Sequence, residues 1–148
     1  MKRYVNAVPV LDLEIAAGAF SHEQWIDECK WAELPEPFVA KEGFFVAKVV
    51  GESMNKRIPN GSWCVFKESP GRQGRVVLVQ HRKIQDPETG QYTVKIFESK
   101  KSGSEDSWLH EQIILRPDSR ESGFKEIVLQ RDDAAELRVI GEFVAVVG

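Results

Sequence analysis

The feature that most constrains the fold is a regular series of short β-prone runs separated by turn-forming residues. The breakers are proline- and glycine-containing segments, such as Pro59-Asn60-Gly61 and Pro70-Gly71, and they recur at intervals typical of an all-β domain. This spacing predicts a mostly β protein, a curled antiparallel sheet or partial barrel closed by its last strand. The expected strands cover residues 44–50, 62–67, 75–81, 92–98, 108–115, 125–130 and 137–147.

The part of the chain before residue 44 has a different pattern. Residues 1–20 read as an extended arm, because Val8-Pro9-Val10 disfavours a helix and the small residues 16–19 have little to bury. Ser21 and Gln24 are spaced as a capping box, so a short N-terminal helix is expected over residues 21–31. With 148 residues and 42% hydrophobic content, residues 21–148 are expected to form a single domain.

Composition excludes several classes of function. A net charge of -3 gives no general attraction to phosphate backbones, so direct nucleic-acid binding is not expected. No apolar run approaches the roughly 20 residues that a membrane span needs, and no secretory leader is visible, so a cytoplasmic protein is expected. Cys29 and Cys64 are expected to be reduced, and the three histidines show no ligand spacing with them. No metal or other cofactor is expected.

Two short motifs carry possible chemistry. In Gly51-Glu52-Ser53-Met54 a β-prone run stops at a glycine and a serine follows, a junction at which backbone N–H groups can point toward a developing oxyanion. In Thr93-Val94-Lys95 the period of two places Thr93 and Lys95 on one face of a strand, where burial would lower the pKa of the amine. Each motif also has a plain structural interpretation, a turn serine and a surface lysine.

Taken together, the two motifs resemble the LexA/UmuD family of self-cleaving serine peptidases. Ser53 occupies the position of that family's nucleophile, in a Gly-x-Ser-Met motif, and Lys95 that of its base, 42 residues later (95 minus 53). The resemblance extends over Val8 to Val147 and implies the fold of a LexA C-terminal domain. The further segments that carry it are 57–62, 71–77, 115–119, 124–127 and 137–141.

The resemblance also implies a scissile bond upstream of the nucleophile. In this family the bond joins a small residue to glycine after an apolar stretch, and Ala17-Gly18 has that form. The same residues also suit a flexible linker. In the cleavage interpretation, neutral Lys95 takes the proton of the Ser53 hydroxyl as the oxygen attacks the carbonyl of Ala17, and the backbone N–H groups of Glu52 and Ser53 hold the oxyanion.

The expected function is thus autoproteolysis of the N-terminal arm, a regulatory switch in a DNA-damage or stress response. Family resemblance suggests a RecA-like filament or a polymerase as protein partner. A homodimer is expected through the C-terminal strand, residues 142–147, whose apolar residues would otherwise form an exposed edge. Two alternatives stay open: a UmuD-like binding module that regulates a polymerase, and a peptidase that acts on other chains. Repressor members of the family carry a helix-turn-helix domain before the bond, and only 17 residues precede it here, so we expect the chain to resemble a standalone member such as UmuD, or a repressor that lacks its DNA-binding half.

Overall fold

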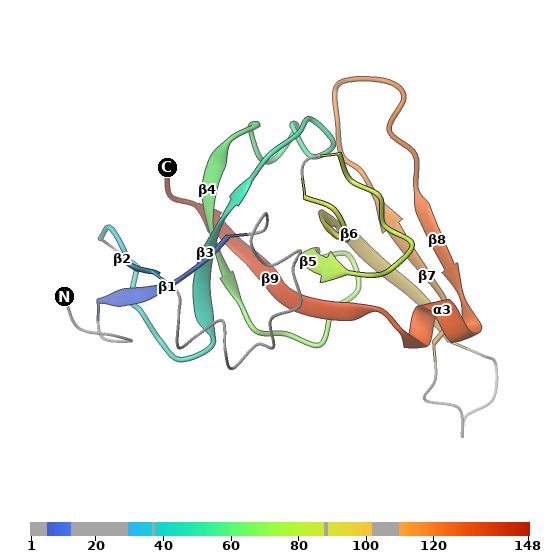
Figure 1. Cartoon of the computed structure of the whole chain (residues 1–148), viewed down its shortest axis with the longest axis horizontal. Helices are drawn as coiled ribbons and strands as arrows, with labels where there is room; N and C mark the ends of the chain where they lie inside the picture. The colour runs from blue at the N-terminus through green and yellow to red at the C-terminus, as the bar shows by residue number, and fades with distance from the viewer. Residues whose placement is uncertain (1–5, 13–29, 37, 88, 102–109) are drawn as a thin grey trace.

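A computed structural model describes residues 6–12, 30–36, 38–87, 89–101 and 110–148. In this part of the chain nine strands form one open sheet in the order β2-β1-β3-β4-β9-β5-β6-β7-β8 (Figure 1). The strands are β1 (Ala7–Leu11), β2 (Lys30–Glu33), β3 (Phe44–Val49), β4 (Ser62–Lys67), β5 (Val76–Gln80), β6 (Tyr92–Lys101), β7 (His110–Arg116), β8 (Ile127–Gln130) and β9 (Arg138–Val146). The prediction of a mostly β, curled sheet is confirmed, and each of the seven predicted runs contains a strand.

The expected closure of the sheet by its last strand is wrong. Strand β9 lies in the middle, where it pairs antiparallel with β4 on one side and with β5 on the other. Register shifts lie opposite it in both neighbours, between Val65 and Phe66 and between Leu78 and Val79. Irregularities of this kind bend and twist strands. The sheet therefore has two halves, β1 to β4 and β5 to β8, joined through β9 (Figure 1).

The region before residue 44 contributes two strands that were not predicted. β1 pairs antiparallel with β2 and parallel with β3, and this parallel pair departs from the expected all-antiparallel sheet. The helix expected over 21–31 lies mostly outside the described residues, but its last two residues belong to β2, where Trp31 pairs with Pro9. Within the described residues the one helix is α3 (Arg131–Ala135), just before β9. No helix in that part of the chain is long and apolar enough to span a membrane.

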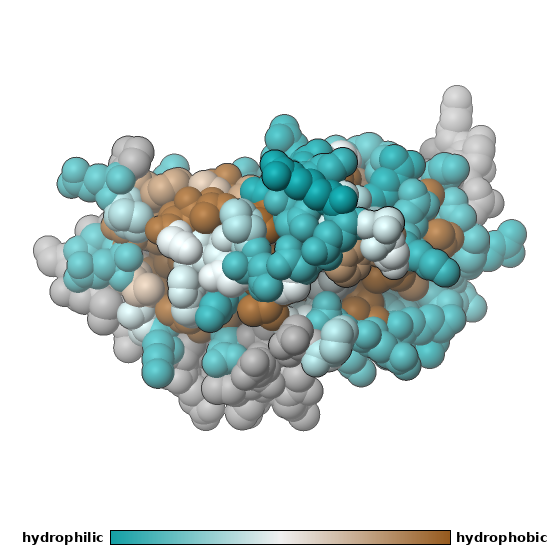
Figure 2. Space-filling model, turned by 90° about the horizontal axis from the view of Figure 1, so that it is seen from above, coloured by the Kyte–Doolittle hydropathy of each residue, from teal (hydrophilic) through white to brown (hydrophobic). Residues whose placement is uncertain are grey.

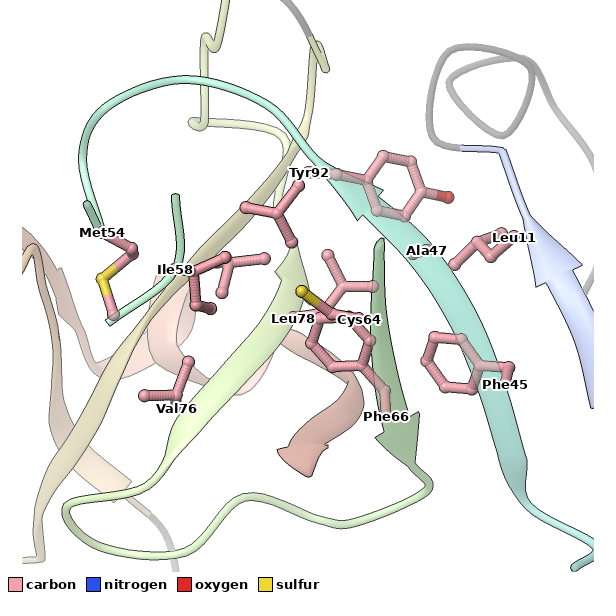
Figure 3. Packing of buried hydrophobic residues seen from close by; sticks show 12 residues of the cluster. Leu11, Phe45, Ala47, Met54, Ile58, Cys64, Phe66, Val76, Leu78 and Tyr92 are labelled. Atoms are coloured by element: carbon pink, nitrogen blue, oxygen red, sulfur yellow. The ribbon is translucent and has the colours of Figure 1, made fainter. Parts of the chain in front are cut away.

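A hydrophobic cluster between the two halves supports the segment that follows β3. Met54 and Ile58 from this segment are 2% and 0% exposed and lie among side chains of β3, β4 and β5 (Figure 3). Phe66 stacks on Phe45 with ring centroids 5.5 Å apart, and its other neighbour, Phe143, lies edge-on. The turn after β3 is thus anchored in the core by its own apolar side chains.

Gly141 of β9 leaves no room for a side chain in the middle of the sheet. A Cβ atom there would lie 2.7 Å from the ring of Phe45 and 3.1 Å from the carbonyl oxygen of Lys67. We expect Gly141→Ala to lower the free energy of unfolding by about 1–3 kcal/mol, because the added methyl group overpacks a filled site. Urea denaturation measures this change. Gly148→Ala is the matched control, since its Cβ would meet Trp63 at an ordinary 3.7 Å. Equal stability of the two variants would contradict the expectation.

Candidate active site

Ser53 lies in a turn that glycine allows to leave strand β3 sharply. Gly51 has a φ of 99°, a region that side chains disfavour, and its N–H donates to Asn60 Oδ1 over 2.8 Å. Gly61, with a φ of 83°, donates its N–H to the carbonyl of Val49 at 2.7 Å and returns the chain toward β4. The Asn60-Gly61 pair therefore fixes both ends of the loop that carries Ser53.

A loop from the far half of the sheet also holds this turn. The N–H of Asp118, which follows β7, donates to the carbonyl of Ser53 at 2.8 Å, and the Asp118 carbonyl accepts the N–H of Lys56 at 3.1 Å. The Asp118 carboxylate pairs with Arg57 Nε at 2.7 Å. Asn55 Oδ1 accepts the N–H of Arg120 at 2.7 Å. The backbone of Ser53 is thus fixed by a segment more than 60 residues away in the sequence.

Lys95 reaches Ser53 from β6. Its Nζ donates hydrogen bonds to Ser53 Oγ at 2.9 Å, to Thr93 Oγ1 at 2.6 Å and to the carbonyl of Val94 at 3.2 Å. The Lys95 side chain is buried, with 6% of the residue exposed. The predicted common face of Thr93 and Lys95 is present, and the Thr93 hydroxyl takes part in orienting the amine.

The environment of Lys95 makes its amine a weaker base than an ordinary lysine. Burial lowers the pKa of Lys95 from 10.5 to about 8, because the charged ammonium loses hydration, and the carboxylate of Asp86 acts in the opposite direction. With this pKa, about one amine in ten is neutral at pH 7. A group that can accept a proton near neutral pH therefore lies within hydrogen-bond distance of the Ser53 hydroxyl.

The backbone beside Ser53 offers hydrogen-bond donors. Among the described residues, none accepts a hydrogen bond from the backbone N–H of Glu52, Ser53 or Met54. A small cleft opens at this point, and its walls come from the turn, from the hairpin before β6 and from β6 itself. It is lined by Val49, Val50, Gly51, Ser53, Met54, Asp86, Thr89, Thr93 and Val94. In the described part of the chain these N–H groups have no acceptor, and N–H groups of this kind next to a serine hydroxyl can stabilise an oxyanion.

The structure brings together Ser53 and Lys95, which the sequence predicted, and surrounds them with residues that the sequence did not predict. Asp86 and Thr89 line the cleft, and Asn55 and Asp118 make hydrogen bonds that hold the turn. The spacing of these residues in the sequence does not indicate that they lie near Ser53. The available signal for Asp118 was the resemblance of segment 115–119 to the family. The predicted scissile residues, Ala17 and Gly18, lie outside the described residues.

Among the described residues one cluster of potential metal ligands exists, but its atoms already have hydrogen-bond or ion-pair partners. His81, Asp133 and Glu136 offer ligand atoms within 4.8 Å of one another. His81 Nε2 lies 2.8 Å from the carbonyl of Asp133, its Nδ1 accepts the N–H of Lys83, and both carboxylates pair with Arg82. This arrangement is that of a salt-bridge network that ties α3 to the end of β5.

Cys64, the cysteine within the described residues, is chemically inert. Cys64 is fully buried in the core cluster, and burial raises the pKa of its thiol to about 12. A thiol of this kind is neither a nucleophile nor a ready metal ligand at neutral pH. The candidate chemistry of the described residues is therefore concentrated at Ser53 and Lys95.

Comparison with known protein families shows which family the chain belongs to. The family model of the Peptidase S24-like proteins matches residues 9–144, nearly the whole chain. The protein therefore belongs to the Peptidase S24-like family, and the family supports a function of the serine peptidase, self-cleaving regulatory kind. No curated protein matches the chain.

The burial of Lys95 predicts a pH-dependent effect on stability. Its pKa is lower in the folded than in the unfolded chain, so below pH 8 the folded state is penalised by about 3 kcal/mol, and the penalty disappears as the pH rises to 10.5. In a Ser53→Ala background, we expect Lys95→Met to raise the free energy of unfolding at pH 7. The gain is at most the penalty that is removed, and the loss of the hydrogen bonds of Lys95 reduces it. Near pH 10.5 the penalty has disappeared, so the double variant should no longer be more stable than Ser53→Ala. Urea denaturation at the two pH values checks it. The expectation would be contradicted if the difference in stability between the double variant and Ser53→Ala favoured the double variant less at pH 7 than at pH 10.5.

Proposed function

We propose that this protein is a serine endopeptidase that cleaves its own N-terminal arm between Ala17 and Gly18. The observation that carries this function is the 2.9 Å hydrogen bond between Lys95 Nζ and Ser53 Oγ. Ser53 is the nucleophile, and neutral Lys95 is the general base that takes the hydroxyl proton as Oγ attacks the carbonyl carbon of Ala17. The pKa of about 8 supports this role, because it leaves part of the amine neutral at physiological pH.

Each later step has a group in the site that suits it. The backbone N–H groups of Glu52 and Ser53 stabilise the oxyanion of the tetrahedral intermediate. The Lys95 ammonium then donates its proton to the nitrogen of Gly18, so that the peptide bond breaks and an acyl-enzyme with Ala17 is formed. Water completes the hydrolysis, with Lys95 again as base. Because the arm is tethered to the domain, the bond reaches Ser53 at a high effective concentration without a deep substrate pocket.

The biological setting is a further part of the proposal. Cleavage would act as a regulatory switch in a cytoplasmic DNA-damage or stress response, triggered by a protein such as a RecA-like filament. Membership of the Peptidase S24-like family supports a self-cleaving regulatory kind of function, and the resemblance of the motifs to the LexA/UmuD family suggests the DNA-damage setting. A binding module that regulates a partner such as a polymerase is the second candidate, because the family also includes members without catalysis. Affinity capture with cleaved protein and with Ser53→Ala protein separates these two candidates. A binding module should have a partner that binds only the cleaved or only the uncleaved protein, whereas a pure peptidase should have no such partner.

The test of the peptidase function is the mass of the product. We expect the purified protein to convert to a fragment that begins at Gly18 and has 131 residues (148 minus 17). The rate should rise with pH as Lys95 loses its proton and level off above the pKa of about 8. Intact-mass spectrometry after incubation between about pH 6 and pH 10 measures both the cut and the profile.

Three variants serve as controls for this experiment. Ser53→Ala and Lys95→Ala should be folded and uncleaved. Lys95→Arg should be uncleaved too, because a guanidinium stays protonated throughout this range and cannot accept the serine proton. A flat profile, a different cut site or appreciable cleavage of Lys95→Arg would show that Ser53 and Lys95 do not act as proposed.

A homodimer through the C-terminal strand, residues 142–147, is also part of the proposal. In the registers of β9, β5 pairs with it only as far as Glu142, and β4 alone pairs with its later residues, 143–146. Support comes from apolar side chains at the end of β9 and on its neighbour β4: Trp63, Val144 and Val146 are 40%, 38% and 39% exposed. In Figure 2, hydrophobic residues gather on the half of the molecule that contains β1 to β4. An apolar surface of this kind is a common site of protein association.

We expect Val146→Asp to convert the dimer to a monomer, because the new carboxylate would be desolvated in the contact. Light scattering at micromolar concentration measures the mass. Phe143 is unsuitable for this test, since it packs edge-on against Phe66 in the core, and its change to Asp would unfold the sheet. The matched control is Val128→Asp on β8, at 46% exposure, which should leave the mass unchanged. A wild-type protein that is already monomeric would rule out this surface as a dimer contact.

A further inference from the structure

The cleft beside Ser53 contains an acidic side chain that the proposed reaction does not use. Asp86 lines the same cleft as Ser53 and Thr93, although it comes from the hairpin that precedes β6. We propose that Asp86 restrains the reaction: it is an acidic residue in the cleft where Ser53 and Thr93 accept hydrogen bonds from Lys95 Nζ, and a nearby carboxylate holds that amine in the form that cannot accept a proton. This inference rests on the proposed Ser53–Lys95 chemistry and adds to it the residue that sets its rate near neutral pH.

The hairpin holds Asp86 in a defined place. Asp86 and Gly90 exchange two backbone hydrogen bonds, of 2.8 and 2.9 Å, which close the turn. The Asp86 carboxylate accepts the N–H of Thr89 at 3.0 Å, and the Thr89 hydroxyl donates to the carbonyl of Tyr92 at 2.7 Å. Thr89 is itself buried. Thr89 therefore links the Asp86 carboxylate to Tyr92 of β6. Lys95 lies on the same strand, three residues after Tyr92.

The electrostatic effect of this carboxylate opposes that of burial. Desolvation is the larger cause and lowers the pKa of Lys95, whereas the negative charge of Asp86 raises it. An opposite charge close to an amine stabilises the protonated form in this way. Because the site is largely removed from water, the attraction is screened less than it would be on an open surface.

The other charged groups on elements packed around Lys95 already have partners. Glu52, on the Ser53 turn, accepts a hydrogen bond from Asn55 Nδ2. Arg57, on the same turn, pairs with Asp118. On β9, two strands from Lys95 in the sheet, the buried Glu142 is held by bidentate hydrogen bonds from Arg72 and by Lys67.

Further along β6, Glu98 pairs with Arg116. Tyr92, on the same strand, has its pKa raised by burial, so it is neutral near pH 7. Among the described residues, Asp86 is the acid whose charge raises the pKa of Lys95.

The restraint has a direct kinetic consequence. Below the pKa of the base, the rate is proportional to the fraction of Lys95 that is neutral, so any group that favours the ammonium slows the reaction near pH 7. Above that pKa the amine is neutral with or without Asp86, and the two rates converge. Removal of the carboxylate is therefore expected to accelerate cleavage, the opposite of what loss of a supporting residue does.

Asp86→Asn tests this inference, because asparagine keeps a side-chain oxygen that can accept the N–H of Thr89. In the otherwise native full-length chain, we expect its cleavage at pH 7 to be about threefold faster than that of the native protein, which corresponds to a profile moved by about half a pH unit. At pH 10 the two proteins should cleave at equal rates.

A second measurement does not depend on cleavage. In the Ser53→Ala protein, NMR titration of Lys95 labelled with ¹³C at Cε gives the midpoint of the amine directly, and Asp86→Asn should lower it by the same half unit. Asp132→Asn is the matched control, because it removes one acidic charge from the exposed first turn of α3 and should change neither the midpoint nor the rate.

The outcomes separate this inference from the proposed function. If the native protein fails to cleave at any pH, the proposed function is wrong, while the titration still decides whether Asp86 acts on Lys95. If the native protein cleaves but Asp86→Asn changes neither rate nor midpoint, or changes them no more than Asp132→Asn does, the restraint is overturned. A slower Asp86→Asn protein with an unchanged midpoint overturns it as well, because that result assigns Asp86 a purely structural role.

Discussion

The central position of β9 is the constraint on which the rest of the molecule depends. Ser53 follows β3 in one half of the sheet, and Lys95 lies on β6 in the other, so the two meet only because β9 pairs with β4 and β5 at once. Gly141 allows this strand to pass under the ring of Phe45. Glu142, one residue later, is buried, and its bidentate pair with Arg72 fixes the same crossing point.

The site combines a lysine that is energetically costly to bury with a serine turn that the surrounding structure holds in place. A buried lysine is unfavourable by several kcal/mol unless its surroundings offer hydrogen bonds, and here Thr93, Val94 and Ser53 accept them. The serine is fixed from two directions, by Met54 in the core and by Asp118 from the loop after β7. Lys95 can therefore stay buried with a lowered pKa, because the turn cannot move away from it.

Local patterns predicted the elements of this fold much better than their arrangement. Alternating apolar residues and glycine- or proline-containing turns predicted all seven strands after residue 44, since these signals act between near neighbours. The order of strands depends on contacts between distant segments, so the placement of β9 could not be inferred, nor could the pairing of β1 with β2 and β3. Ser53 and Lys95 were found through their motifs. Asp86 and Asp118 were not, because each reaches the site through a loop whose path no periodicity describes.

The place of β9 in the chain also bears on the order in which the protein is made. Residues 138–146 leave the ribosome after every other strand of the sheet, yet they join its two halves. While the chain is being synthesised, β3 with β4 and β5 with β6 can form as local hairpins, but no strand holds one pair beside the other. Contacts between such distant segments form late, because the loops between them must first be closed. A nascent chain would thus carry Ser53 and Lys95 in separate pieces, and the two would come together only when its final strand is complete.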